Sequence, residues 1–146
     1  MSFWNRTHNL GRMNFEQLVR AFVTYPAVHA YLLLAVISIA VAAISASAVL
    51  PLIVAVALAI LVYPAVWYLL HRFVLHGRYL YKSPLTAAAW KRIHFDHHQD
   101  PHNLVVLFGA LYTTIPTIAL VTIPVGYLIG GPAAAALAFA MGILST

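Results

Sequence analysis

The sequence predicts an all-α membrane protein with about four transmembrane helices, arranged as two hairpins with a histidine-rich helical segment between them. Three observations lead to this fold class. Of the 146 residues, 63% are hydrophobic and only 8% are charged, which is typical of membrane proteins. Two apolar runs without charged residues, 27–70 and 104–146, are each long enough for about two spans of ~20 residues. The polar stretch between them holds five of the eight histidines within residues 71–98.

Residues 1–25 combine three arginines with large apolar side chains. Asn14 is a favourable N-cap for a helix that would continue to about Thr24. Apolar residues recur at helical spacing along one side of this helix: Phe15, Leu18, Val19 and Phe22. We therefore expect an amphipathic helix that lies in the membrane interface.

Residues 26–70 are expected to form the first transmembrane hairpin. The turn is expected between Ser45 and Pro51, because proline is tolerated in the first turn of the second helix. His29 lies near the start of the first span, and no second histidine keeps helical spacing with it. We interpret it as a hydrogen-bonded histidine at the interface instead of a metal ligand.

Residues 104–146 are expected to form the second hairpin. Gly130-Gly131-Pro132 is a strong turn signal, while a turn at Pro124 would instead divide the run into two complete spans. With the turn at Gly130, the 14 residues after Pro132 make ~21 Å of helix, whereas the hydrocarbon core is ~30 Å thick. In that interpretation the sequence ends inside its fourth crossing, and we expect the second hairpin to be truncated.

Basic residues precede the first hairpin and also follow it. The three N-terminal arginines come before the hairpin in the sequence. The segment 71–103, which follows it, contains Arg72, Arg78, Lys82, Lys91 and Arg92. The positive-inside rule puts both segments, and with them the histidines, on the cytoplasmic side of an integral, multi-pass membrane protein. The net charge of +5 does not indicate nucleic-acid binding, because the basic residues flank apolar spans instead of lining a groove.

The segment 71–103 contains two groups of histidines, His71 with His76, and His94 with His97 and His98. Neutral imidazoles are common ligands of iron, copper and zinc, so their clustering predicts a metal site. The second group converges, because residues three and four apart share one face of an α-helix. A step of five residues turns ~140° around an α-helix, so His71 and His76 diverge somewhat. They could bind one ion with the help of long rotamers or a frayed helix end near Gly77, or they could serve two ions.

Two other residues are candidates for metal ligation or for support of a ligand. Asp96 could accept a hydrogen bond from a ligand's Nδ1–H, and an exposed helical position is an equally good interpretation. His102 follows His98 by four residues but lies beyond Pro101, which is expected to end a helix that begins at Ser83-Pro84. Without a metal, the same histidines and arginines would form a patch that binds lipid headgroups.

The amino-acid sequence around the two histidine groups resembles that of a known protein family. His71-Arg72-Phe73 with His76, and His97-His98-Gln99-Asp100-Pro101 preceded by His94, are similar to the first two histidine boxes of the fatty acid hydroxylase / sterol desaturase superfamily. The likeness covers residues 63–103 in detail. It implies a membrane enzyme with a non-haem di-iron centre, whose ligands would include these five histidines.

The resemblance also implies a reaction. The irons, reduced by an electron donor such as a cytochrome or ferredoxin-type protein, would activate O2 and oxidise a C–H bond of a lipid in lipid biosynthesis. The enzyme would then be a hydroxylase or desaturase of a fatty acyl, sphingolipid or sterol-like substrate. The sequence does not distinguish these substrates, and no catalytic residue apart from the ligands is identified.

One departure from the family limits this expectation. Members carry two further histidine boxes, whereas no histidine follows His102 in this sequence. The two boxes supply five ligands, and two irons held by histidine need roughly eight or more. We therefore expect the chain to carry part of a di-iron site and to be inactive by itself. The alternative is a metal-binding membrane protein without oxygenase activity.

Overall fold

The computed structural model describes residues 10–103 and 110–146, and this part of the chain is mainly helical, with no strand. The all-α fold class is thereby confirmed. Three helical stretches are long and apolar enough to cross a membrane: Pro26–Ser45, Val49–Leu75 and Leu111–Leu144. Contacts divide the described residues into two units, one combining the N-terminal part through His29 with Leu70–Thr114, the other combining Ala30–Leu69 with Ile115–Thr146.

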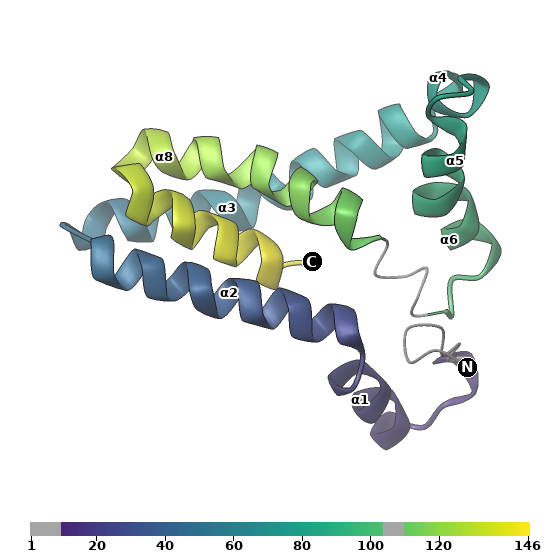
Figure 1. The fold of residues 1–146 in the computed structure, drawn as a ribbon, viewed down its shortest axis with the longest axis horizontal. Coiled ribbons are helices and arrows are strands. Elements are labelled where there is room, and N and C mark those ends of the chain that lie inside the picture. Colours follow the sequence, from purple (N-terminus) through teal and green to yellow (C-terminus); the bar gives the residue numbers. More distant parts are fainter. Residues whose placement is uncertain (1–9, 104–109) are drawn as a thin grey trace. The chain divides into compact units, whose positions relative to one another are not determined.

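The second of these units is built from most of the three long helices, α2 (Pro26–Ser45), α3 (Val49–Leu69) and α8 (Leu111–Leu144) (Figure 1). Pro51 lies in the first turn of α3, where the missing amide donor disturbs no helical hydrogen bond. Small residues of α3 and α8 form the core of this unit: Ala55, Ala59, Ala134 and Ala138. Small side chains let helix backbones approach closely, which is how helices pack in lipid.

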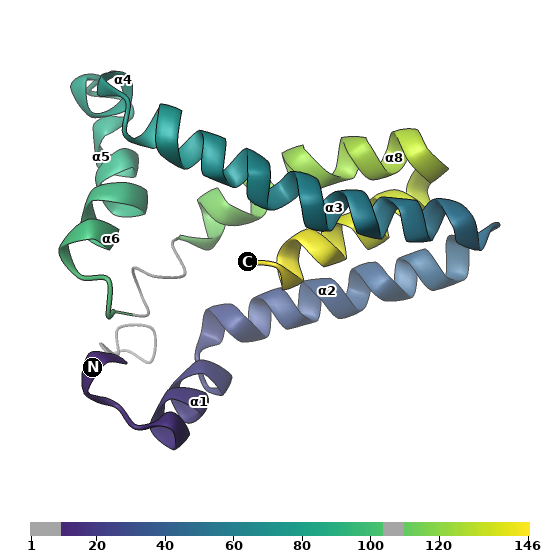
Figure 2. The same ribbon diagram turned by 180° about the vertical axis from the view of Figure 1, so that it is seen from behind.

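The helix α8 consists of two legs that reverse direction at Gly130 and Gly131, whose backbone angles are not helical. Gly131 has φ 67°, a conformation that glycine adopts without strain. Figures 1 and 2 show the two legs side by side. A Cβ atom on Gly126 would lie 2.5 Å from the carbonyl oxygen of Ala134, so the legs touch through their backbones. The turn is therefore at Gly130-Gly131, and Pro124 lies inside the first leg.

The first unit begins with a short helix η2 (Leu10–Arg12), which is followed by α1 (Phe15–Val23). Asn14 caps α1 as expected: its side chain accepts from Gln17 N, and the Gln17 side chain accepts from Asn14 N. This reciprocal pair satisfies two backbone donors at the helix start.

Residues 70–103, which we call the histidine segment, contain five short helices: η3 (Leu70–Leu75), α4 (Arg78–Lys82), α5 (Ala87–Trp90), η4 (Lys91–Phe95) and α6 (Asp96–Gln99). The helix expected to start at Ser83-Pro84 instead starts at Ala87. Ser83 is not its cap, because Thr86 N and Ala87 N donate to the Ser83 carbonyl in a preceding turn, and the Thr86 hydroxyl bonds to Leu80 O. The last of these helices ends at Gln99, just before Asp100-Pro101, as expected.

Candidate metal centre

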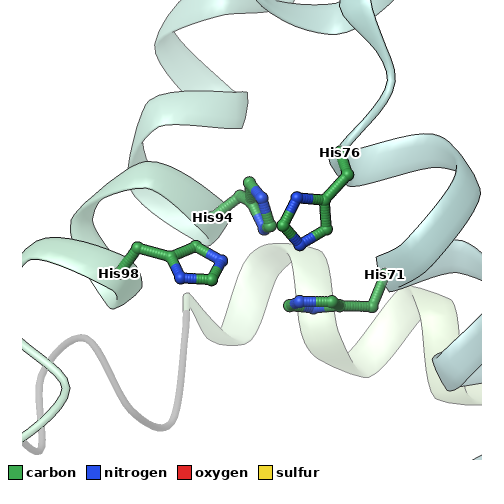
Figure 3. Close-up of side chains that lie close together, drawn as sticks. All are labelled: His71, His76, His94 and His98. Atoms are coloured by element: carbon green, nitrogen blue, oxygen red, sulfur yellow. The ribbon is translucent and has the colours of Figure 1, made fainter.

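Four imidazoles meet within the first unit: His71, His76, His94 and His98 (Figure 3). One nitrogen from each ring can be chosen so that all four lie within 4.8 Å of one another. The ring centroids of neighbouring members are as close as 4.4 Å, between His76 and His94. The two sequence groups predicted from spacing therefore face each other across one cluster, which we call the histidine cluster.

His71 and His76 converge because the helix that carries them is not an α-helix. η3 is π-helical, and the amide of His76 donates to the carbonyl of His71, five residues back, at 3.2 Å. A bond over five residues widens the turn, so the fifth residue returns to the face of the first. The divergence expected from α-helical geometry is therefore wrong, and the two ring centroids are 5.0 Å apart.

The second pair of histidines follows the predicted geometry. His94 lies in η4, a second π-helical turn in which Asp96 N donates to Lys91 O, and His98 lies in the α-helical turn that follows. Their four-residue spacing puts both rings on one face, with centroids 4.6 Å apart. The convergence of His94 and His98 is confirmed.

Trp90 connects the two histidine-bearing segments. Its indole Nε1–H donates to the carbonyl oxygen of Leu75 at 2.7 Å, across fifteen residues of sequence. The indole ring also packs beside His94, 5.6 Å between centroids, and beside Tyr81, 5.3 Å. The sequence alone did not identify Trp90 as part of this site. Its position four residues before His94, on the same helical face, was the signal for this role.

The histidine cluster is enclosed on one side and open on the other. His94 is buried, with 3% of its surface exposed, and His71 is half-buried, whereas His76 and His98 are exposed. An ion at this place would therefore be held against the protein by His94 and would remain accessible from the side of His76 and His98.

The spacing of the nitrogens suits one transition-metal ion. With metal–nitrogen bonds of about 2.0–2.1 Å, ligands lie about 3.4 Å apart in a tetrahedral site and about 4.2 Å apart across an octahedral one. A spread of at most 4.8 Å needs only a small inward rotation of the rings to reach either arrangement. Four imidazoles and no carboxylate favour iron, copper or zinc over magnesium or calcium.

Asp96 and His102 are not among the four grouped side chains. Asp96 forms an ion pair with Lys91. The carbonyl of His102 accepts a hydrogen bond from Leu10 N at 3.1 Å, and its side chain is not among the grouped ligands. The side chain of His97 lies outside the described residues.

His29 has the hydrogen-bonded position that its isolated place in the sequence predicted. Its Nε2 lies 2.6 Å from the carbonyl oxygen of Val23, so the ring donates to one of the last carbonyls of α1. The last carbonyls of a helix have no partner within the helix, and a histidine donor satisfies one of them.

Comparison with known proteins adds no family to this geometry: no family model matches the chain, and neither a curated protein nor a solved structure is similar to it.

Proposed function

We propose that the histidine cluster binds a single iron ion in a membrane protein that takes part in O2-dependent oxidation of a lipid, as a hydroxylase or desaturase. The observation that carries the proposal is the approach of four imidazole nitrogens to within 4.8 Å from two separate segments. Four such rings are seldom brought together without an ion to share their lone pairs, because a protonated member would repel the others.

Iron and lipid oxidation rest on the resemblance of the two histidine groups to the first two boxes of the hydroxylase and desaturase superfamily. The position of the histidines in the chain supports the same function. The apolar helical stretch Val49–Leu75 contains His71, and His76 follows it directly, so the cluster stands at the end of a candidate membrane span. A lipid tail could approach a site at that depth without leaving apolar surroundings.

The proposal includes the number of membrane crossings and the side of the membrane on which the histidines lie. Four crossings in two hairpins, the second formed by the legs of α8, would return the chain to the side on which it started. The basic residues beside the histidines put that side in the cytoplasm. An external one-electron donor with an acidic surface would then meet a basic segment, which favours its association.

The residues of this chain would have three tasks in such a site. His71, His76, His94 and His98 would hold the ion, which when bound supplies the activation of O2. Burial of His94 would keep water from one side of the ion, and the exposed sides of His76 and His98 would admit oxygen and substrate. Four histidines complete the ligand set of about one ion, so a second iron would need ligands beyond this cluster.

A second candidate function is metal binding without oxygenase activity. It is favoured by the number of ligands in the cluster, since four nitrogen ligands suffice for a closed tetrahedral site such as that of structural zinc.

The first experiment measures bound metal in the complete chain, reconstituted in lipid nanodiscs after expression with iron, copper and zinc available. About one ion per chain is expected, and less than a tenth of that in His94→Ala or His71→Ala. His29→Ala and His102→Ala serve as matched controls and should retain the ion. A wild-type chain without bound metal, or equal metal in all four variants, would refute the site.

The second experiment tests the reaction in membranes of the cells that make the protein, where any further ligands and the electron donor are present. We expect an oxygen-dependent hydroxylated or desaturated lipid that disappears in cells carrying His94→Ala. The purified chain with a reductase system should form no such product, because it holds the ligands of one ion. If the wild-type chain binds iron but the lipid profile of the His94→Ala cells is unchanged, only the second candidate function, metal binding without oxygenase activity, remains.

A further inference from the structure

Three aromatic rings follow one another from the histidine cluster to the protein surface. The indole of Trp90 lies beside the imidazole of His94, with 5.6 Å between centroids, and the phenol ring of Tyr81 lies beside the indole at 5.3 Å. Aromatic rings at such separations are in contact. His94 is 3% exposed, Trp90 is half-buried and Tyr81 is 43% exposed, so the series begins at the buried histidine and ends at the surface. All three residues belong to the first unit.

The rings of this series differ in how readily they lose an electron. In a protein without cysteine, indole and phenol are the side chains that lose one electron most readily, and this sequence has no cysteine. Phe95 also lies beside Trp90, at 6.0 Å, but its phenyl ring is not oxidised under the same conditions. An electron drawn from Trp90 is therefore replaced from Tyr81 and not from Phe95.

The hydrogen bond of Trp90 determines what happens to its proton. Its Nε1–H donates to the carbonyl oxygen of Leu75 at 2.7 Å, and Leu75 is 7% exposed. A peptide carbonyl is too weak a base to take this proton, so an oxidised indole keeps the proton and remains a strong oxidant. The exposed phenol of Tyr81 releases its proton to water as it loses an electron, which makes it the easier ring to oxidise at neutral pH. The electron therefore moves from Tyr81 to Trp90.

An oxidising equivalent left at the histidine cluster would damage the ligands themselves. Imidazole takes up oxygen under such conditions, and an oxidised ring binds a metal ion less well because its nitrogen lone pair is lost to the ring. His94 is in contact with Trp90, so an electron supplied through the indole arrives at this ligand. Electron transfer slows exponentially with distance, which favours two short steps between touching rings over one long step.

We propose that Trp90 and Tyr81 form an aromatic relay, which protects the histidine cluster by carrying an oxidising equivalent to the surface when no lipid consumes it. The inference rests on the proposed function for its oxidant, a peroxide reduced at the iron site. Cleaving the O–O bond of one hydrogen peroxide molecule takes one electron from iron(II) and one from Tyr81 through Trp90. The phenol proton and one proton from water complete two water molecules, and a tyrosyl radical remains. A donor of one electron and one proton, such as ascorbate, restores the phenol.

The electron exchange between Trp90 and Tyr81 is measured without any metal. In the complete chain in nanodiscs, Trp4→Phe and Trp67→Phe leave Trp90 as the one tryptophan, and azide radicals made by pulse radiolysis oxidise it selectively. We expect the tryptophanyl absorption to decay as the tyrosyl absorption rises, at a rate independent of protein concentration. Tyr81→Phe keeps the ring and should slow this step at least tenfold. Tyr79→Phe, at an 83% exposed position on the same helix, is the matched control and should leave the rate unchanged.

Equal rates in Tyr81→Phe and in its parent chain would overturn the aromatic relay, whatever ion the histidines bind. An equal loss in Tyr79→Phe would also overturn it, because the electron would then come from the exposed tyrosines of α4 in general and not from the ring beside Trp90.

The protective role is tested in the chain loaded with one equivalent of iron(II), with the bound iron measured in each sample. After addition of hydrogen peroxide, freeze-quench electron paramagnetic resonance should detect a tyrosyl radical in wild type and in Tyr79→Phe but not in Tyr81→Phe. Peptide mass spectrometry should find at least threefold more oxygen added to His94 in Tyr81→Phe than in wild type. Tyr79→Phe should match wild type.

The two experiments separate the aromatic relay from the proposed function. Equal oxidation of His94 in all three proteins, with iron bound, would overturn the protective role and leave the metal site standing. A chain that binds no iron would refute the metal site and the protective role together, whereas the exchange between Trp90 and Tyr81 is decided by pulse radiolysis alone.

Discussion

Replacing Trp90 by phenylalanine should weaken metal binding without removing a ligand. The change keeps an aromatic ring beside His94 and deletes the Nε1–H that donates to Leu75 O at 2.7 Å. That bond joins the segment of His71 and His76 to the segment of His94 and His98. Without it, the two halves of the histidine cluster lose their direct polar connection, and the arrangement competent to bind an ion becomes less populated.

The magnitude follows from the burial of the acceptor. Leu75 is 7% exposed, so its carbonyl would have little access to water in place of the lost donor. Leaving a buried acceptor without a partner costs about 1–3 kcal/mol. Since each 1.4 kcal/mol is about tenfold in an equilibrium constant, the apparent dissociation constant for the ion should rise by about 5- to 150-fold.

The measurement is a competition titration of the reconstituted chain with Zn²⁺ or Co²⁺ against a chromophoric chelator. Trp67→Phe is the control, because Trp67 belongs to α3, where its ring stacks on Tyr63 with centroids 6.5 Å apart. Equal dissociation constants for wild type and Trp90→Phe, or an equal loss in Trp67→Phe, would refute the role of the hydrogen bond.

Three other changes have expected outcomes. Deleting Val74 should preserve bound metal, because an α-helix brings residues four apart onto one face. Inserting one alanine at the same place should turn His76 away by ~100° and abolish binding in the same metal assay. Gly126→Ala should lower the thermal midpoint in detergent by destabilising the legs of α8 by about 1–3 kcal/mol, since its Cβ would meet Ala134 O, whereas Leu128→Ala, at an 86% exposed position, should not. Saturating Zn²⁺ at about 100 times its dissociation constant should stabilise the folded chain by about 2.7 kcal/mol, and a chelator should reverse the shift; a midpoint indifferent to Zn²⁺ would contradict a site that forms only in the folded state.

Local signals in the sequence were sufficient wherever a feature depends on neighbouring residues. Asn14 caps α1 because its partner, Gln17, is three residues away. The turn of α8 lies at Gly130-Gly131 because Gly131 adopts a positive φ, and its neighbour has no Cβ to strain. His94 and His98 converge because four residues make about one turn of an α-helix.

Features that depend on distant contacts could not be predicted in this way. The sequence Leu-His-Arg-Phe-Val-Leu does not determine whether residues 70–75 form an α-helix or a π-helix. The carbonyl of Leu75, at the end of this stretch, accepts its hydrogen bond from Trp90, fifteen residues later. The start of α5 lies at Ala87 and not at Ser83 for a different reason: a turn formed by neighbouring residues, in which Thr86 donates to the carbonyls of Leu80 and Ser83, competes with the cap expected at Ser83.

The five-residue hydrogen bond between His76 and His71 has a consequence for how metal motifs are recognised. On an α-helix, residues three and four apart share a face, whereas residues five apart do not. A π-helical turn makes the five-residue spacing equivalent to the four-residue one, at the cost of one added residue in the helix. Two histidines five residues apart can therefore face one ion where the turn between them is π-helical, just as two histidines four residues apart can on an α-helix.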